Sequence, residues 1–204
     1  MFSNTPPWQD VLDYWFGNGL QRGWPEPPRD ALWFAGGAAA DAEIERRFGS
    51  LVEAALSKEL VDWESQPFPR LALLILLDQF TRNIHRGTAR AFAGDHRAVT
   101  LVNEGLALGM DRKLPWVGRV FFYMPLMHAE DLALQQKCIK CFAGLVDEAP
   151  PEVAGHMRTN LAYAREHAEV IERFGRFPHR NEALLRESTP EEIDYLRDAN
   201  RYGQ

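Results

Sequence analysis

The chain has 204 residues, of which 46% are hydrophobic and 25% charged, and its formal net charge is −6. This composition is that of an ordinary soluble globular domain, and the acidic balance argues against a nucleic-acid partner held by bulk positive charge. No run reaches the roughly 18 apolar residues that a membrane-spanning helix needs, and residues 1–10 lack the features of a signal peptide, so we expect a single cytoplasmic domain over residues 1–204 with no membrane partner.

The first part of the chain predicts helices separated by glycine and proline. Thr5 and the prolines after it are typical of a helix start, and apolar residues then recur at helical spacing as far as Gly17. Residues 18–30 are rich in glycine and proline, which predicts an irregular connection long enough to cover a groove. A further helix, capped by Asp41, is expected to run to about Leu60.

The stretch 68–86 carries the strongest signal in the sequence. Seven apolar residues, Leu71–Leu77, lead without a break into charged ones, which is enough for two turns of buried helix. Asp78, Arg82 and His85 are spaced three or four residues apart, so they share one helical face while the opposite face stays apolar. We expect these three side chains to point into a polar site.

The second part of the chain predicts helices from Thr88 or Asp95 to about Leu108, then over 115–123, 126–146 and 152–174. Pro125 is expected to kink or restart a helix, and Gly175 to end one. Thr189 and Glu192 have the spacing of a capping box, and the tail over 200–204 is expected to fray.

The cysteine content is one C-x-x-C pair, Cys138 and Cys141, in a predicted helix. One such pair supplies only two zinc ligands, and no strand precedes it as in a redox motif, so we expect reduced structural thiols.

The pattern as a whole indicates an all-α domain. About seven to nine helices with mostly short connections predict antiparallel helix hairpins, since no stretch alternates apolar and polar residues as a strand does. Two arrangements stay open, a right-handed stack of hairpins and a compact bundle.

Four stretches carry a resemblance to a known family: residues 78–83 (DQFTRN), 121–131 (FFYMPLMHAED), 173–181 (RFGRFPHRN) and 188–192 (STPEE). In this order they resemble the bacterial family called domain of unknown function 924, from about Trp8 to Leu196. The resemblance implies an all-α fold similar to tetratricopeptide-repeat proteins and implies no established reaction. Thr81 stands where the family usually has proline, and Ala129 where serine is common.

The candidate ligand-binding residues fall in two segments, near positions 80 and 180, which must be neighbours in space to form one site. They are Asp78, Arg82, Asn83, Arg176, Arg180 and Asn181. Their guanidinium and amide groups could bind a carboxylate or phosphate, and loops on rigid scaffolds often carry function. The structural alternatives are an Asp78–Arg82 ion pair and arginines that cap helix carbonyls.

The candidate catalytic residues are His128, Asp131 and His179. On the predicted helix 126–146, His128 and Asp131 share a face with Gln135, so Asp131 could fix the tautomer of the imidazole as a general base requires. The alternative is a satisfied polar seam between helices, because no nucleophile is evident. No metal site or cofactor is expected, since the sequence lacks H-E-x-x-H, phosphate-loop and dinucleotide motifs.

Two functions follow from these residues. The favoured hypothesis is a binding module whose Arg/Asn/His-lined groove holds an anionic small molecule, or a peptide or protein partner through its carboxylate or phosphate. The alternative is a small-molecule enzyme of hydrolase type, with His128 or His179 as acid/base and Asp78 or Asp131 as the orienting carboxylate. An open concave surface would support the first, and a closed pocket with buried ionisable groups the second.

A third, structural hypothesis is a homodimer that pairs through an exposed apolar patch. The residues expected to form that patch are Trp15, Phe16, Trp33 and Phe34.

Overall fold

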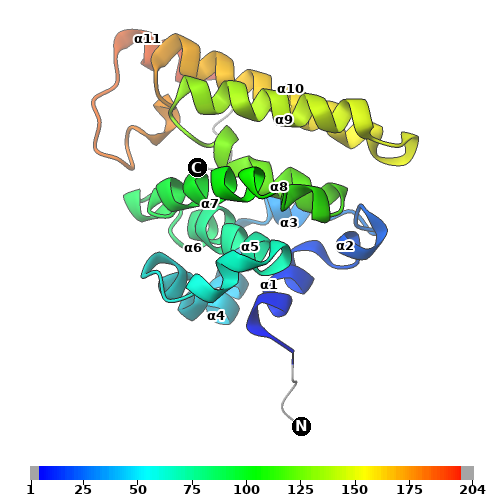
Figure 1. The fold of residues 1–204 in the computed structure, drawn as a ribbon. Coiled ribbons are helices and arrows are strands. Elements are labelled where there is room, and N and C mark those ends of the chain that lie inside the picture. Colours follow the sequence, from blue (N-terminus) through cyan, green and yellow to red (C-terminus); the bar gives the residue numbers. More distant parts are fainter. Residues whose placement is uncertain (1–4, 199–204) are drawn as a thin grey trace.

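The computed structural model describes residues 5–198, and within that range the chain is helical and contains no strand (Figure 1). The expected fraying over 200–204 lies outside the described residues. The α-helices are α1 (Pro7–Phe16), α2 (Gly19–Arg22), α3 (Asp30–Ala35), α4 (Gly37–Leu56), α5 (Pro67–Leu74), α6 (Thr81–Ile84), α7 (Asp95–Ala107), α8 (Trp116–Met127), α9 (Leu132–Glu148), α10 (Pro151–Phe174) and α11 (Pro190–Asp198). Across residues 5–198, none of these helices combines the length and the apolar character required to cross a membrane.

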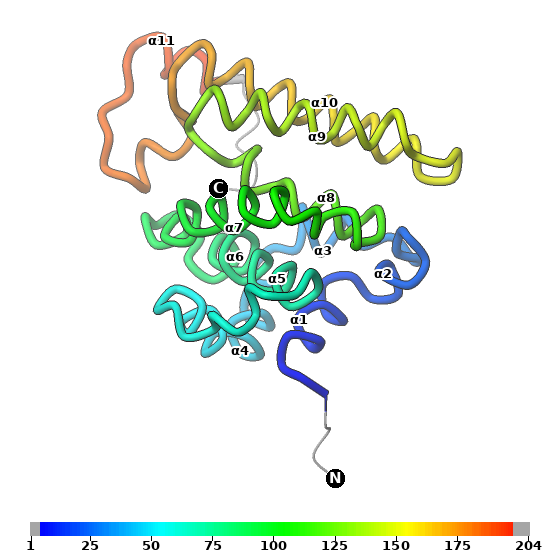
Figure 2. The backbone as a smooth tube through the Cα atoms, in the orientation of Figure 1, coloured from blue at the N-terminus to red at the C-terminus, as the bar shows by residue number. Residues whose placement is uncertain are grey.

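The helices stack in layers. In Figures 1 and 2, α9 and α10 lie side by side as a long hairpin above α8 and α7, while α4, α5 and α6 lie beneath these with α1. α9 packs against both α10 and α8, so the hairpin is joined to the rest of the molecule through α8. The all-α prediction is confirmed, and eight helices of eight residues or more fall within residues 5–198, inside the expected seven to nine.

The core is rich in aromatic rings that meet edge to face. The ring centroids of Trp15, Phe16 and Trp33 lie 5.8, 5.2 and 4.8 Å from that of Phe121. Such contacts add to the apolar burial that holds the helices together. The expected dimer patch is therefore wrong for Trp15, Phe16 and Trp33, which are buried, and of its four residues only Phe34 is exposed.

The boundaries of two early helices differ from the prediction. The N-cap of α1 is Pro6 rather than Thr5. Asp41 lies inside α4, which ends at Leu56, and it accepts hydrogen bonds from Asn83 and Arg86 instead of capping a helix. The carboxylate is thus used by a tertiary contact, which outweighs its local preference for a cap.

The predicted helix over 126–146 is two helices. α8 continues through Pro125 to Met127, because a buried helix tolerates the loss of one backbone hydrogen bond, and α9 begins at Leu132. Asp131 is the N-cap of α9, and its Oδ1 accepts from the Leu134 N–H at 2.9 Å. His128 and Asp131 consequently share no helical face, and the role expected for Asp131 beside His128 is wrong.

The central stretch is helical over the predicted range but contains a π turn, Ile75–Phe80, between α5 and α6. The Thr81 N–H reaches the carbonyl of Leu76, five residues back. A π turn accommodates one extra residue and shifts the helical register after it. His85 accordingly leaves the expected face and lies beside Arg90 and Glu53, with its Nε2 3.3 Å from Arg90 Nε.

The signals near the C-terminus are confirmed. The Glu192 N–H donates to Thr189 Oγ1 at 3.2 Å and the Thr189 N–H donates to Glu192 Oε2 at 2.8 Å, which is the predicted capping box of α11. α10 ends at Phe174 with Gly175 in the left-handed conformation.

Cys138 and Cys141 are free thiols within α9.

Gly94 allows α7 to approach the π turn. A Cβ atom at position 94 would lie 2.2 Å from the carbonyl oxygen of Leu77, and its backbone dihedrals are ordinary helical ones, so space alone requires glycine here. Asp95 follows as the first residue of α7. This close approach brings the Asp95 carboxylate to the end of the central helix.

We predict that Gly94→Ala destabilises the protein by at least about 2 kcal/mol, because the clash is with backbone that cannot rotate away. The measurement is the free energy of unfolding in urea. Gly144→Ala in α9 is the matched control, since nothing lies within 4 Å of its added methyl, and it should stabilise by roughly 0.5–1 kcal/mol. Equal effects at the two positions would contradict the close contact.

Candidate functional site

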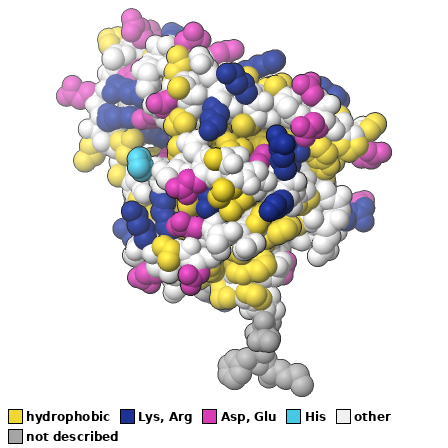
Figure 3. All heavy atoms as spheres, in the orientation of Figure 1, with side chains coloured by type: hydrophobic (Ala, Val, Ile, Leu, Met, Phe, Trp, Pro, Cys, Tyr) yellow, Lys and Arg dark blue, Asp and Glu magenta, His cyan; other side chains and the backbone are white. Residues whose placement is uncertain are grey.

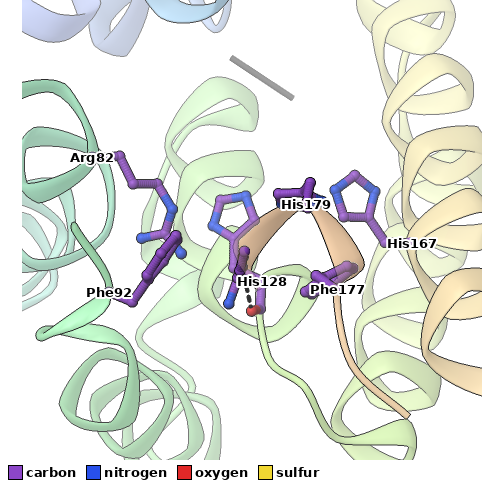
Figure 4. A pocket seen from close by; sticks show the side chains of 7 residues that line it. Arg82, Phe92, His128, His167, Phe177 and His179 are labelled. Atoms are coloured by element: carbon purple, nitrogen blue, oxygen red, sulfur yellow. Dashed lines mark hydrogen bonds between the residues drawn. The ribbon is translucent and has the colours of Figure 1, made fainter. Parts of the chain in front are cut away.

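A cavity of about 50 Å³ lies where α6, the end of α8, α10 and the loop after α10 meet. Its lining consists of Arg82, Phe92, His128, His167, Phe177, His179 and Arg180. Figure 4 shows Arg82 and Phe92 on one side and His167 and Phe177 on the other, with His128 and His179 between them. A space of this size holds roughly three or four water molecules or one small polar group.

Arg82 and Arg180 meet at one carboxylate, that of Asp95. Arg82 donates from Nη1 and Nη2 to the two oxygens of Asp95, both at 2.9 Å, and Arg180 Nη1 lies 3.4 Å from Asp95 Oδ2. Both guanidinium groups are largely buried. The segments near positions 80 and 180 are therefore neighbours, as the site hypothesis requires.

Arg180 is held between two aromatic rings. Its guanidinium carbon lies 4.6 Å from the ring centroids of both Phe92 and Phe177, and its Nη2 donates to the carbonyl oxygen of His128 at 2.9 Å. Its buried Nε has no hydrogen-bond partner in the described part of the chain. Burial and the positive charge of Arg82 lower the pKa of Arg180 to about 10, so it stays charged at neutral pH in a region of excess positive potential.

His128 is oriented by the buried carboxylate of Asp78, which lies in the π turn. The Nδ1 atom of His128 is 2.8 and 3.0 Å from the two oxygens of Asp78. Gln79 donates to the same carboxylate at 2.5 Å, and Arg82 Nη1 lies 3.2 Å from it. Although burial opposes ionisation, the charges of His128 and Arg82 hold the pKa of Asp78 below its ordinary value. Because its Nδ1 is bonded to this carboxylate, Nε2 is the ring nitrogen of His128 that is left for a further partner.

The other two imidazoles are kept neutral by their surroundings. Burial, followed by the influence of His128, lowers the pKa of His167 to about 4, and its Nδ1 lies 2.8 Å from the Tyr163 carbonyl. Burial, followed by the charge of Arg180, lowers the pKa of His179 to about 3. Within residues 5–198, no group of three or more His, Cys, Asp or Glu side chains could hold a metal ion.

The loop that carries His179 and Arg180 is fixed from outside the cavity. Glu130 accepts from the Phe177 N–H at 2.7 Å and pairs with both terminal nitrogens of Arg186. Arg176 pairs with Glu192, and buried Asn181 bonds Ser188, Glu192 and Arg186. Arg176 and Asn181, predicted to bind ligand, instead hold the loop in shape.

The remaining predicted site residues fall into two groups, those at the cavity and one that lies away from it. Arg82, Arg180, His128 and His179 line the cavity, and Asp78 supports His128 from behind. Asn83 lies elsewhere and donates to Asp41 at 2.8 Å. Asn83 is therefore not part of this cavity, because Asp41 of α4 supplies it with a structural partner.

Sequence reasoning missed Asp95 and His167. Asp95 was expected only as a helix start, and its bonds to two distant arginines depend on packing. His167 gave a usable signal, because it lies three residues after Ala164 on the buried face of α10, where the other buried positions are apolar apart from this ring. A titratable residue on an apolar face can mark a site.

Other arginines near this region are neutralised. Arg86 pairs with Asp41, and Arg90 pairs with Glu53, both from α4, while Arg97 pairs with Glu64. Figure 3 likewise shows acidic and basic side chains interspersed over one face of the molecule. The arginines at positions 86, 90 and 97 are thus ion-paired outside the cavity, and Arg82 and Arg180 differ from them in lining it.

Comparisons with known proteins identify relatives without an assigned activity. The family described as "Bacterial protein of unknown function (DUF924)" matches residues 11–200. The solved structure of a protein of unknown function, ATU0120 from Agrobacterium tumefaciens, is 38% identical, with a TM-score of 0.78 over 94% of this chain and 97% of that chain. No curated protein matches this chain.

We predict that buried His167 makes the protein less stable in acid. Its folded pKa of about 4 lies below its unfolded value of about 6.5, so the unfolded state binds more protons between these values. The stabilisation is complete above pH 6.5 and is lost as the pH falls towards 4, by up to about 3 kcal/mol. Urea unfolding of the wild type and of His167→Gln at pH 7 and pH 4.5 measures this.

The control for this prediction is His96→Gln, because His96 is an exposed histidine on α7. The stability difference between the wild type and His167→Gln should shrink or reverse at pH 4.5, while that for His96→Gln should stay nearly constant. A difference for His167→Gln that does not change with pH would contradict a neutral buried ring.

Proposed function

We propose that this chain, which belongs to the bacterial DUF924 family of unknown function, binds a small molecule through a carboxylate or phosphate group. The binding site is the cavity between Arg82 and Arg180. The observation that supports this proposal most strongly is the chemistry of the lining, because every polar side chain that lines the cavity is an arginine or a histidine.

The arrangement of charge supports an anion. The carboxylates of Asp78 and Asp95 are absent from the cavity lining and lie behind His128 and the arginines, so they orient the donors without occupying the space between them. A guanidinium has five N–H groups, and the bonds from Nη1 and Nη2 of Arg180 leave others for a ligand. Burial, followed by the positive charge of Arg82, lowers the pKa of Arg180, and an incoming anion would offset the repulsion between the two guanidinium groups.

The size of the cavity supports a single small group over an extended peptide. About 50 Å³ admits one carboxylate or phosphate but no run of residues. Buried ionisable side chains surround this space, which is the arrangement that the sequence analysis associated with the small-molecule enzyme, so the same cavity also supports the second candidate function described below. The proposal does not include a peptide bound in a groove like that of tetratricopeptide-repeat proteins.

We predict that inorganic phosphate binds at pH 7 and that Arg180→Gln weakens binding at least about tenfold, because charge-assisted hydrogen bonds contribute roughly 1.5–3 kcal/mol each. Isothermal titration calorimetry measures the affinity, and thermal melting checks that the variant folds. Arg82→Lys should weaken binding less than Arg180→Gln does, because lysine retains the positive charge even though it loses the paired bonds to Asp95.

The matched control removes an arginine on the surface. Arg46→Gln breaks an exposed pair with Glu43 on α4 and should leave phosphate binding unchanged. Absence of binding to phosphate, sulfate and acetate at millimolar concentration in the wild type would end this proposal.

A second candidate function, acid/base catalysis on an anionic substrate, is favoured by the contact between His128 and Asp78. A buried, ionised carboxylate that orients an imidazole facing a cavity is the arrangement of a general base. The cavity lining contains no Ser, Thr, Cys or Lys side chain, so the nucleophile would be water.

For this candidate we predict hydrolysis of p-nitrophenyl phosphate that falls about a hundredfold or more in His128→Gln. Asp78→Asn should lower the rate and shift its pH profile. Asp131→Asn is the control, because that residue only caps α9 and asparagine caps equally well. Turnover by the wild type that survives His128→Gln would refute the candidate.

A further inference from the structure

A second, larger pocket of about 120 Å³ lies between α10, α8 and α3. Its wall is mainly aromatic, with Trp24, Trp33, Phe34, Phe121 and Tyr163 among the lining side chains. Phe34 is 62% and Tyr163 45% exposed, so two of the few exposed large apolar residues in the described chain gather at its mouth. Exposed apolar surface beside a pocket is typical of a ligand site.

The rings of this pocket are set at steep angles to one another. Trp33 makes interplanar angles of 89° with Trp24, 75° with Phe34 and 65° with Phe121. Parallel rings would form a slot for a planar ligand, whereas steeply inclined rings form a box for a compact, rounded group. One parallel stack exists here, between Trp24 and His156 at 4.0 Å, and it is already filled by the protein's own ring.

The charge of the lining selects a cation. Asp30 is the only acidic or basic side chain among the lining residues apart from the imidazole of His156. Asp30 is exposed, and it makes no ion pair within residues 5–198. Aromatic faces attract alkylated ammonium groups through their negative π-electron density, and a nearby carboxylate strengthens that attraction. A rounded organic cation therefore fits both the shape and the charge of this pocket.

This pocket lies about one helical turn away from the cavity between Arg82 and Arg180, which is called the anion cavity from here on. Tyr163 and His167, four residues apart on α10, line the second pocket and the first, respectively. Likewise, Met124 in α8 lines the second pocket, and His128 at the C-cap of α8 lines the anion cavity. Because four residues of helix advance by about 6 Å, the two spaces lie in sequence along the seam between α8 and α10.

We propose that the ligand is a small zwitterion whose anionic group binds between Arg82 and Arg180 and whose alkylated ammonium group binds in the aromatic pocket beside Asp30. This inference rests on the proposed function for its anionic half only. The volume of the second pocket is comparable to the roughly 150 Å³ of an engineered protein cavity that holds one small organic ring.

The test titrates three probes by calorimetry: phosphocholine, choline and inorganic phosphate. Phosphocholine should bind more tightly than either of the others. Phe34→Ala and Asp30→Asn should weaken choline and phosphocholine by about twofold to thirtyfold and leave phosphate unchanged, since Phe34 is exposed and its loss does not affect the core. Arg180→Gln should weaken phosphate and phosphocholine and leave choline unchanged.

Two controls isolate the charge and the position. The neutral isostere 3,3-dimethyl-1-butanol should bind much more weakly than choline, and Leu108→Ala, which removes an exposed apolar side chain elsewhere, should change nothing. Equal binding of choline and its neutral isostere, or no binding of choline, would overturn the inference while phosphate binding could stand. If choline binds and phosphate does not, the cation pocket stands and the proposed function is refuted. If phosphocholine binds no more tightly than choline or phosphate alone, the proposal of a zwitterionic ligand is refuted.

Discussion

The shared carboxylate of Asp95 is the interaction on which the site depends. Two largely buried guanidinium groups from segments about a hundred residues apart would repel each other without it, and burying an unpaired charge is costly. Asp95 can occupy this place because Gly94 lets the start of α7 lie against the π turn. The first turn of a helix also favours a negative side chain, so local structure and tertiary contact agree at this residue.

The cavity is distinguished from the rest of the basic surface by how its charges are arranged. Arginines such as Arg86 and Arg90 are met directly by carboxylates of α4 and have little attraction left for a ligand. At the cavity, Asp78 and Asp95 stand behind the groups that line the space, so donors face inwards. The stacking of Arg180 between Phe92 and Phe177 keeps this arrangement rigid, which reduces the entropy that a ligand must overcome.

Local signals predicted the local features, and packing decided the rest. The capping box at Thr189 and Glu192 and the glycine stop at Gly175 depend on neighbouring residues, and both are found as expected. The break between α8 and α9 has no glycine or proline to mark it, so Asp131 looked like a helical neighbour of His128 when it is a cap. The partners of Asn83 and Arg176 come from distant carboxylates, and no spacing rule identifies these.

The π turn makes the position of Arg82 depend on chain length as well as on side-chain identity. It holds one residue more than an α-helix of the same rise, and this surplus sets the rotational phase of everything that follows it. If the same residues were wound as a regular α-helix, everything after the turn would be rotated by about 100° about the helix axis relative to α5. The apolar helix before the turn would keep its place in the core while the guanidinium of Arg82 pointed away from the cavity, so the wider winding of the π turn is what places Arg82 at the site.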